Sequence, residues 1–229
     1  MPSEILSRLN RLFFPPVVNP KIFCIGRNKT GTTSLEKAFM DLGYSLGNLR
    51  NAELLLPSYI HNDFKPIIDF CHSATVFQDS PFSYPETYKH LDKAFPGSKF
   101  ILSVRDSSEQ WYNSITTAHS KTISPGRIPT SEDLKNYDYV YKGWVWKVNR
   151  ALYKTPENDP YNQEMLIAHY EKHNKDVLKY FEGRKNLLVV NVSRSASYEA
   201  FCSFIGRRPL YKEFPWENKT SDIVPVTDK

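Results

Sequence analysis

IFCIGRNKTGTTSLEKAFMDLG, residues 22–43, is the stretch that decides the fold. Its first four residues are apolar and end at a glycine, which is the pattern of a short buried strand. Apolar residues then recur with helical spacing from Leu35 to Leu42, and Gly43 follows them, so an amphipathic helix is expected there. A strand, a glycine-containing loop and a helix in this order form the setting of a phosphate-binding loop.

The alternation of strands and helices continues along the chain. Three more apolar segments are predicted as strands: residues 74–77, 100–104 and 187–192. Further helices are predicted from these residues: Tyr88, Leu91 and Phe95; Trp111 and Ile115; Tyr137 to Tyr153; a long helix ending near Phe181; and Phe201 and Phe204 before Gly206. This order predicts an α/β, three-layer fold of the P-loop type, with a central, mostly parallel β-sheet flanked by helices.

No internal repeat and no low-complexity linker divides the chain, so residues 1–229 are interpreted as one domain. Residues 1–19 are interpreted as an N-terminal helix or arm. Residues 119–162 break the rhythm with several prolines and are interpreted as an insertion that forms a lid over the acceptor. The alternative is that Trp144 and Trp146 in this segment pack in a core.

Composition excludes several classes of protein. The net charge of +5 suits an anionic ligand, but no run of Lys and Arg follows a nucleic-acid backbone, so no nucleic-acid partner is expected. No stretch reaches the length of about 18 apolar residues that a transmembrane segment needs. Residues 5–14 lack the continuous apolar core of a signal peptide.

The three cysteines, Cys24, Cys71 and Cys202, leave one thiol over in any pairing, and none lies in a CxxC motif. They are interpreted as buried free thiols of a reducing compartment. The sequon Asn28-Lys29-Thr30 lies inside the predicted phosphate loop, where a glycan would block the ligand. Both observations favour the cytoplasm.

The loop departs from a nucleotide-binding Walker A motif at one position. That motif has lysine directly after its second glycine, whereas here Thr32 follows Gly31 and Lys29 stands two residues before it. Backbone N–H groups at a helix N-terminus can still bind an anion, with hydroxyls of Thr32, Thr33 and Ser34 as further donors. A P-loop nucleotide kinase or NTPase therefore remains an alternative that Thr32 disfavours.

Two segments resemble one enzyme family. Lys29-Thr30-Gly31-Thr32-Thr33 resembles the 5′-phosphosulfate loop of the PAPS-dependent sulfotransferases, where PAPS is 3′-phosphoadenosine 5′-phosphosulfate. FILSVRDSSEQWYNS, residues 100–114, resembles the family's 3′-phosphate segment. The resemblance also covers Asp79-Ser80-Pro81-Phe82 at a predicted strand end, and residues 214–220 resemble a stretch of the family's small bacterial-type members.

The resemblance implies that the donor is bound by these residues: Arg27, Asn28, Lys29, Thr30, Gly31, Thr32, Thr33, Ser34, Arg105 and Ser114. Lys29 would stabilise charge that develops on the bridging and sulfuryl oxygens. Arg105 would bind the 3′-phosphate through its planar guanidinium. The family usually places its serine eight residues after this arginine, where the chain has Asn113, so Asn113 is the alternative to Ser114.

The acceptor needs a general base, and Asp79 at a predicted strand end is the first candidate. A turn or capping role for Asp79 is the competing interpretation, and His119 is the second candidate base. No His and Cys cluster has metal-ligand spacing, and a phosphosulfate anhydride is activated enough to need no metal.

The resemblance implies a sulfotransferase that moves the sulfuryl group from PAPS to an acceptor hydroxyl or amine and releases adenosine 3′,5′-bisphosphate. The acceptor is a small molecule, a glycan or a lipid, and the oligomeric state is open. A catalytically degenerate interaction protein that binds the bisphosphate is a further alternative.

Overall fold

The computed structural model describes residues 20–215, which form two compact units. Residues 20–104 and 177–215 make up the first unit, and residues 105–176 make up the second. The interpretation of residues 1–229 as a single domain stays a prediction. The predicted arm at residues 1–19 lies outside the described residues, as does most of the segment 214–220.

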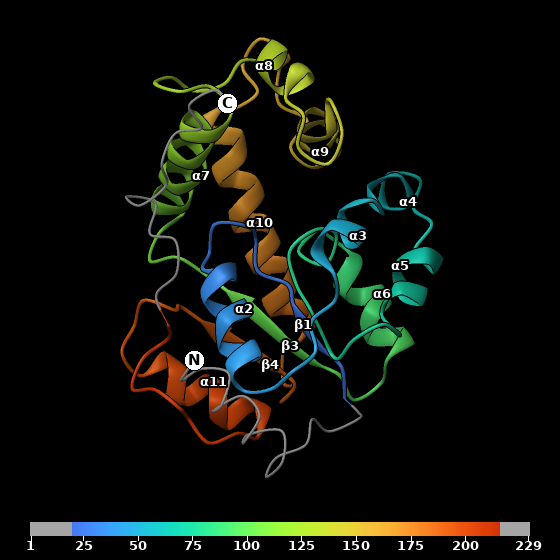
Figure 1. Ribbon diagram of the computed structural model, residues 1–229, viewed down its shortest axis with the longest axis vertical. Helices are drawn as coiled ribbons and strands as arrows, with labels where there is room; N and C mark the ends of the chain where they lie inside the picture. The colour runs from blue at the N-terminus through green and yellow to red at the C-terminus, as the bar shows by residue number, and fades with distance from the viewer. Residues whose placement is uncertain (1–19, 216–229) are drawn as a thin grey trace. The chain divides into compact units, whose positions relative to one another are not determined.

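The first unit is built on a parallel β-sheet with the order β2-β1-β3-β4 (Figure 1). Its strands are β1 (Ile22–Cys24), β2 (Val76–Phe77), β3 (Lys99–Ser103) and β4 (Leu187–Val190). Phe23 lies opposite both Phe77 and Phe100, and Ile101 lies opposite Leu188. The four predicted strands are confirmed, and their ends differ from the prediction by at most two residues.

Helices surround this sheet: α2 (Thr32–Asp41), α3 (Leu49–Glu53), α4 (Leu56–Ile60), α5 (Lys65–Phe70), α6 (Thr87–Ala94) and α11 (Ser197–Ile205). The predictions of α2, α6 and α11 are confirmed. The helices α3, α4 and α5 were not predicted, because elements of five or six residues are too short to show a helical period.

Side chains alternate between the two faces of the sheet, and each face has its own core. Ile22 and Cys24 pack with residues of α2 and α11, including Phe39 and Phe201. Residues on the opposite face pack with α5, α6 and the chain around the end of α10: Phe23, Ile25, Ile67, Leu91, Val177 and Phe181. Helices therefore cover both faces, which confirms the three-layer α/β prediction.

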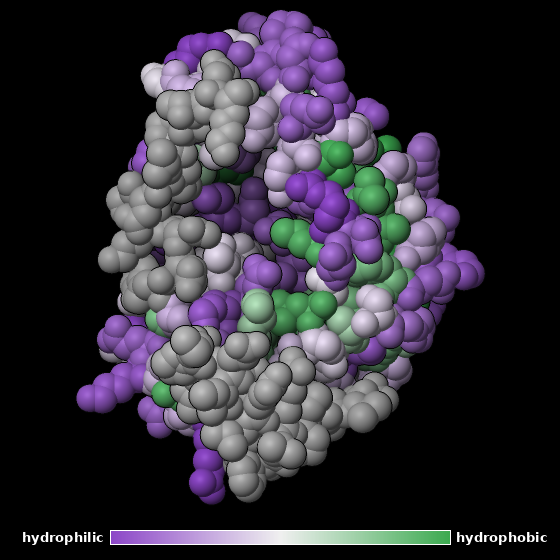
Figure 2. All heavy atoms as spheres, viewed as in Figure 1, coloured by the Kyte–Doolittle hydropathy of each residue, from purple (hydrophilic) through white to green (hydrophobic). Residues whose placement is uncertain are grey.

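Some apolar surface of the first unit stays exposed. Leu49, Leu54 and Ile60 of the α3–α4 region are exposed, and Figure 2 shows hydrophobic residues on the surface there. Scattered exposed apolar residues of this kind are normal in folded proteins. None of the helices formed by residues 20–215 has the length and apolar character that a membrane span requires.

The second unit is helical and contains α7 (Ser108–Thr122), α8 (Ser131–Asn136), α9 (Trp144–Leu152) and most of α10 (Gln163–Tyr180). Its core is Trp111, Ile115, Leu134, Tyr161, Leu166 and Tyr170. The rings of Trp111 and Tyr170 stack with their centroids 4.7 Å apart. A core of this aromatic kind explains why helices without a neighbouring strand form a compact unit here.

The predicted aromatic helix from Tyr137 to Tyr153 is wrong at its start. Helix α9 begins at Trp144, because Gly143 before it has φ 79°, a left-handed conformation that ends helical backbone geometry. Asp138 instead pairs with Lys142 in an isolated antiparallel bridge. The aromatic residues between 137 and 142 therefore lie in a loop.

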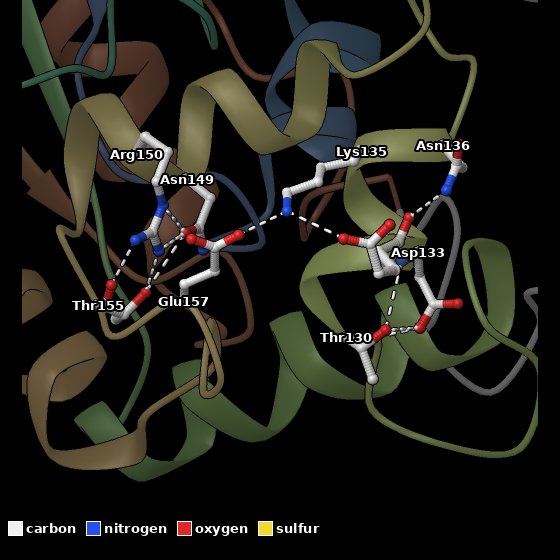
Figure 3. Close-up of polar contacts among 9 residues, drawn as sticks. Thr130, Asp133, Lys135, Asn136, Asn149, Arg150, Thr155 and Glu157 are labelled. Carbon is white, nitrogen blue, oxygen red and sulfur yellow. Dashed lines mark hydrogen bonds and ion pairs between the residues drawn. The ribbon is translucent and has the colours of Figure 1, made fainter.

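Polar contacts tie α8, α9 and the following loop together (Figure 3). Lys135 Nζ lies 2.9 Å from Glu132 and 2.5 Å from Glu157. The Arg150 guanidinium donates to Asn149 and to both oxygens of Thr155, and its centre lies 4.3 Å from the Trp146 ring centroid. The predicted lid at 119–162 is thus a folded, internally bonded segment, and its role over an acceptor stays a prediction.

Candidate functional site

Two glycines allow the loop between β1 and α2 to lie close to Ser103 of β3 and to Val192, which follows β4. A Cβ on Gly26 would lie 2.2 Å from Ser103 Oγ and 2.4 Å from the Ser103 carbonyl oxygen, so no side chain fits there. Gly31 has φ 96°, and a Cβ on it would lie 2.3 Å from Val192 Cγ2. Both positions therefore require glycine, which fixes the path of the backbone around the loop.

Thr30 stabilises the loop through buried side-chain hydrogen bonds. Its side chain is fully buried, and its Oγ1 donates to the Arg27 carbonyl oxygen at 2.5 Å. Because that proton is used, the 2.6 Å contact with Ser103 Oγ must be donated by Ser103. The hydroxyl of Thr30 therefore supports the loop rather than pointing outward.

The first turn of α2 offers backbone donors. Gly31 stands at the N-cap and has no side chain that could accept from the helix, so the N–H groups of Thr32, Thr33 and Ser34 lack intrahelical acceptors. Thr32 and Thr33 are half-buried, whereas Ser34 is buried. This arrangement suits a bound anion, because the helix dipole places partial positive charge at the same end.

Lys29 lies in the loop with φ 65°, a left-handed conformation that is uncommon for a residue with a side chain. It is half-buried, as is its neighbour Asn28. Desolvation raises the pKa of Asp79, and the positive charge of Lys29 is close enough to offset part of this rise. The structure thus brings together, within the first unit, two residues that sequence analysis assigned to catalysis.

Arg27 is buried and its guanidinium is directed toward the segment that follows β2. Its Nη1 donates to the Ser83 carbonyl oxygen at 2.7 Å, and its centre lies 5.9 Å from the Tyr84 ring centroid. Its positive charge also offsets part of the rise that desolvation causes in the pKa of Asp79. Contact of this side chain with a donor stays a prediction.

Asp79 is the second residue after β2 and also has a left-handed backbone, with φ 58°. Desolvation raises its pKa above the ordinary value, and Arg27, the Ser80 backbone N–H and Lys29 partly offset this rise. A carboxyl group with raised proton affinity is a better general base near neutral pH. Its place at the carboxyl end of a parallel strand is where α/β sheets bind ligands.

Sequence analysis missed two residues beside Asp79. Gln78 Nε2 donates to Glu36 Oε2 at 3.3 Å, which joins the end of β2 to α2. The negative charge of Asp79 contributes to a raised pKa of Glu36, after the larger effect of desolvation. Helical spacing could have revealed Glu36, because it lies three and four residues after Thr33 and Thr32 and so shares their helix face.

Arg105 and Ser114 belong to the second unit, where they lie close together. Arg105 Nη2 lies 3.5 Å from Ser114 Oγ, at the limit of a hydrogen bond. The Arg105 backbone N–H donates to the Tyr170 hydroxyl at 3.0 Å, and burial lowers the pKa of the guanidinium. Asn113, the alternative partner, is exposed.

His119 lies on α7 in the second unit, with its Nδ1 2.6 Å from the Tyr161 hydroxyl. Burial raises the pKa of Tyr161, so this hydroxyl keeps its proton across the physiological range. If Tyr161 donates to Nδ1, then Nε2 carries the proton of the neutral ring and His119 has no basic nitrogen left to offer. In the other tautomer Nδ1–H donates to the Tyr161 oxygen and Nε2 stays basic, so the role of His119 as the second candidate base stays a prediction.

Within residues 20–215, no three His, Cys, Asp or Glu side chains are arranged to hold a metal ion. The prediction of buried free cysteines is confirmed for Cys24, Cys71 and Cys202. Burial raises the pKa of Cys71 to about 12 and that of Cys202 to about 11, so these two thiols are not reactive nucleophiles.

Comparison with known proteins gives the family. A family described as "Sulfotransferase domain" matches residues 21–223, which is most of the 229-residue chain. No curated protein matches the chain in a sequence comparison. The match includes the loop at Gly26–Gly31, Asp79 and the Arg105–Ser114 pair. This protein therefore belongs to the sulfotransferase domain family and is a transferase of that class.

Proposed function

We propose that this sulfotransferase takes its sulfuryl group from PAPS and passes it to a hydroxyl or amine of an acceptor. The observation that carries the proposal is the loop that ends at the N-terminus of α2, in which Lys29 lies two residues before Gly31 and close to Asp79. An anionic phosphosulfate fits a backbone of this shape, because the loop combines uncapped helix N–H groups with one lysine.

Each group of residues would bind a different part of the donor. The N–H groups of Thr32, Thr33 and Ser34, with the hydroxyls of the first two, would bind the 5′-phosphosulfate. Lys29 would lie at the bridging oxygen, where negative charge develops as the S–O bond breaks. Arg105 and Ser114, which lie 3.5 Å apart, would bind the 3′-phosphate.

Transfer would proceed with Asp79 as the base. The Asp79 carboxylate would take the acceptor's O–H or N–H proton while the acceptor atom forms a bond to sulfur. The bond between sulfur and the bridging oxygen would break, and its electron pair would leave with adenosine 3′,5′-bisphosphate. General-base catalysis of this kind typically contributes about 10²–10⁴-fold to a rate.

The remaining predictions concern the surroundings of the reaction. A small molecule, a glycan or a lipid is the proposed acceptor, and the segment 119–162 is its proposed lid. We propose the cytoplasm as the compartment, because the three cysteines are free thiols. The charge-stabilising role of Lys29 makes a metal ion unnecessary in this scheme.

The test compares binding of adenosine 3′,5′-bisphosphate and AMP by calorimetry and thermal shift. We expect the bisphosphate to bind and to raise the melting temperature clearly more than AMP does, because only the bisphosphate carries the 3′-phosphate. Lys29→Ala should abolish consumption of PAPS in the presence of an acceptor panel. Lys93→Ala, which removes an exposed lysine from α6, is the matched control and should behave as wild type.

Three results would point elsewhere. Equal stabilisation by AMP and the bisphosphate would contradict the donor assignment. Magnesium-dependent ATP hydrolysis that is lost in Lys29→Ala would support the NTPase alternative. Bisphosphate binding without transfer to any acceptor class would favour the interaction protein.

A further inference from the structure

The carboxylate of Glu36 lies beside the strand end that carries the proposed base. Glu36 is half-buried on α2, one turn after the residues that begin the helix. It accepts a hydrogen bond from Gln78 Nε2, and Gln78 is bonded directly to Asp79 along the chain. This hydrogen bond therefore connects α2 to the corner at which β2 ends, in addition to the apolar packing of the two elements.

The orientation of Gln78 depends on this contact. Its other amide atom, Oε1, is buried and accepts no hydrogen bond from any of residues 20–215. Glu36 accepts only, so the amide must present its NH₂ group to Glu36 and turn its oxygen away. Within the described part of the chain, the hydrogen bond to Glu36 is thus the one that orients the Gln78 amide.

The charged groups around Asp79 come from two elements in addition to its own. The loop supplies Arg27 and Lys29, which favour the charged carboxylate. Helix α2 supplies Glu36, whose pKa is raised first by desolvation and then by the negative charge of Asp79. Two carboxyl groups that interact in this way titrate as a pair. Without Glu36, the two cations would hold Asp79 more firmly ionised and make it a weaker base.

We propose that Glu36 is a positioning residue for Asp79: through Gln78 it fixes the corner after β2, and through its charge it keeps Asp79 able to accept the proton of the acceptor. The proposal rests on the proposed function in one respect, the role of Asp79 as the base.

The matched variants separate charge from shape. Glu36→Gln removes the charge but keeps an oxygen that can accept from Gln78, so the corner is expected to stay folded. Asp41→Asn makes the same kind of change on the same helix, at a carboxylate that faces Lys37 and Tyr211 instead. Glu36→Leu removes both the charge and the acceptor.

The direct readout is a titration of the Asp79 carboxyl carbon by ¹³C NMR. We expect Glu36→Gln to lower the apparent pKa of Asp79 by on the order of 0.5 unit or more, since a like charge has been removed, and Asp41→Asn to leave it unchanged. Reciprocity requires that Asp79→Asn lowers the apparent pKa of Glu36 by a similar amount. An unchanged Asp79 titration, or an equal shift in Asp41→Asn, overturns the proposal.

The second readout is the pH dependence of PAPS consumption. In Glu36→Gln the acid limb of the pH–rate profile should move to lower pH by the same amount. The plateau rate should fall and the KM for PAPS should not change. Glu36→Leu should have a still lower plateau rate than Glu36→Gln. An Asp79 titration that shifts without any change in the rate profile overturns the catalytic role of Glu36. A wild-type protein that consumes no PAPS counts against the proposed function, and the NMR titration then still decides whether Glu36 and Asp79 are coupled.

Discussion

The hydroxyl groups of Thr30 and Ser103 lie 2.6 Å apart and join the loop after β1 to the last residue of β3. Both side chains are fully buried. Ser103 also limits the space at Gly26, so one residue of β3 controls the loop at two points. The shape of the loop between β1 and α2 therefore depends on β3 as well as on its own sequence.

Removing the Thr30 hydroxyl should weaken both the fold and the site. Thr30→Val keeps the shape of the side chain but loses two buried hydrogen bonds, so the free energy of unfolding should fall by about 1–3 kcal/mol. Binding of adenosine 3′,5′-bisphosphate should weaken as well. Thr117→Val, at an exposed position, should change stability by no more than about 0.5 kcal/mol, and a similar loss in both variants would refute the contact.

Gly26→Ala should be more damaging than alanine at another glycine. Its Cβ would meet the Ser103 backbone at 2.4 Å, so β1 and β3 would have to separate. Gly97→Ala meets nothing within 4 Å and bears only the backbone cost of φ 83°, about 1 kcal/mol. Urea denaturation of the two variants gives the comparison, and an equal loss of stability would show that the loop tolerates the displacement.

Asp92 and Arg184 should make the first unit sensitive to acid. Two hydrogen bonds of 2.6 and 2.7 Å join them, and Tyr180 donates a third to Asp92 at 2.9 Å. The bonds from Arg184, and then that from Tyr180, hold the pKa of Asp92 below its ordinary value against the opposing effect of burial.

The sign of the pH effect follows from that lowered pKa. The unfolded chain binds the proton first as pH falls, so the stabilisation is complete at neutral pH and is lost from roughly pH 5 downward. Asp92→Asn should lower the free energy of unfolding by about 1–2 kcal/mol at pH 7 and flatten its dependence on pH below 5. Parallel curves for wild type and variant would mean that another carboxylate is responsible.

Ser114 and Asn113 can be distinguished by binding. Ser114→Ala should weaken binding of adenosine 3′,5′-bisphosphate by about tenfold, because one hydrogen bond and the support of Arg105 are lost. Asn113→Ala should leave the affinity nearly unchanged. AMP provides the control ligand, since its affinity should be insensitive to both substitutions. The reverse order of the two variants would assign the 3′-phosphate contact to Asn113.

The long elements of the fold could be predicted because their periods are clear in the sequence. Residues 22–25 form a continuous apolar run, as expected for a strand buried on both faces. Residues 187–192 form a nearly continuous apolar run as well, although Val189 of β4 is exposed. The start of α9 could not be placed, because the tyrosines before Gly143 continue the aromatic composition of the helix while the backbone at Gly143 ends it. The aromatic composition therefore predicts a helix that the backbone at Gly143 does not continue, and the backbone conformation is known only from the structure.

The candidate site could be predicted where its residues lie close together in the sequence. The loop and the pairing of Arg105 with Ser114 each lie within one short segment, so a motif describes them. The direction of the Arg27 side chain and the partnership of Glu36 with Gln78 depend on contacts between residues 42 or more positions apart. No local pattern carries that information.

Lys29 has a consequence for how substitutions at its position would be selected. Its φ of 65° suits glycine or asparagine better than lysine, at a backbone cost for lysine of about 1–2 kcal/mol. A saturation library at this codon should therefore give different results under two selections. Selection for thermal stability would enrich glycine and asparagine, whereas selection for formation of the sulfated product would recover lysine. The amino acid found at position 29 would thus indicate whether selection had favoured stability or catalytic rate.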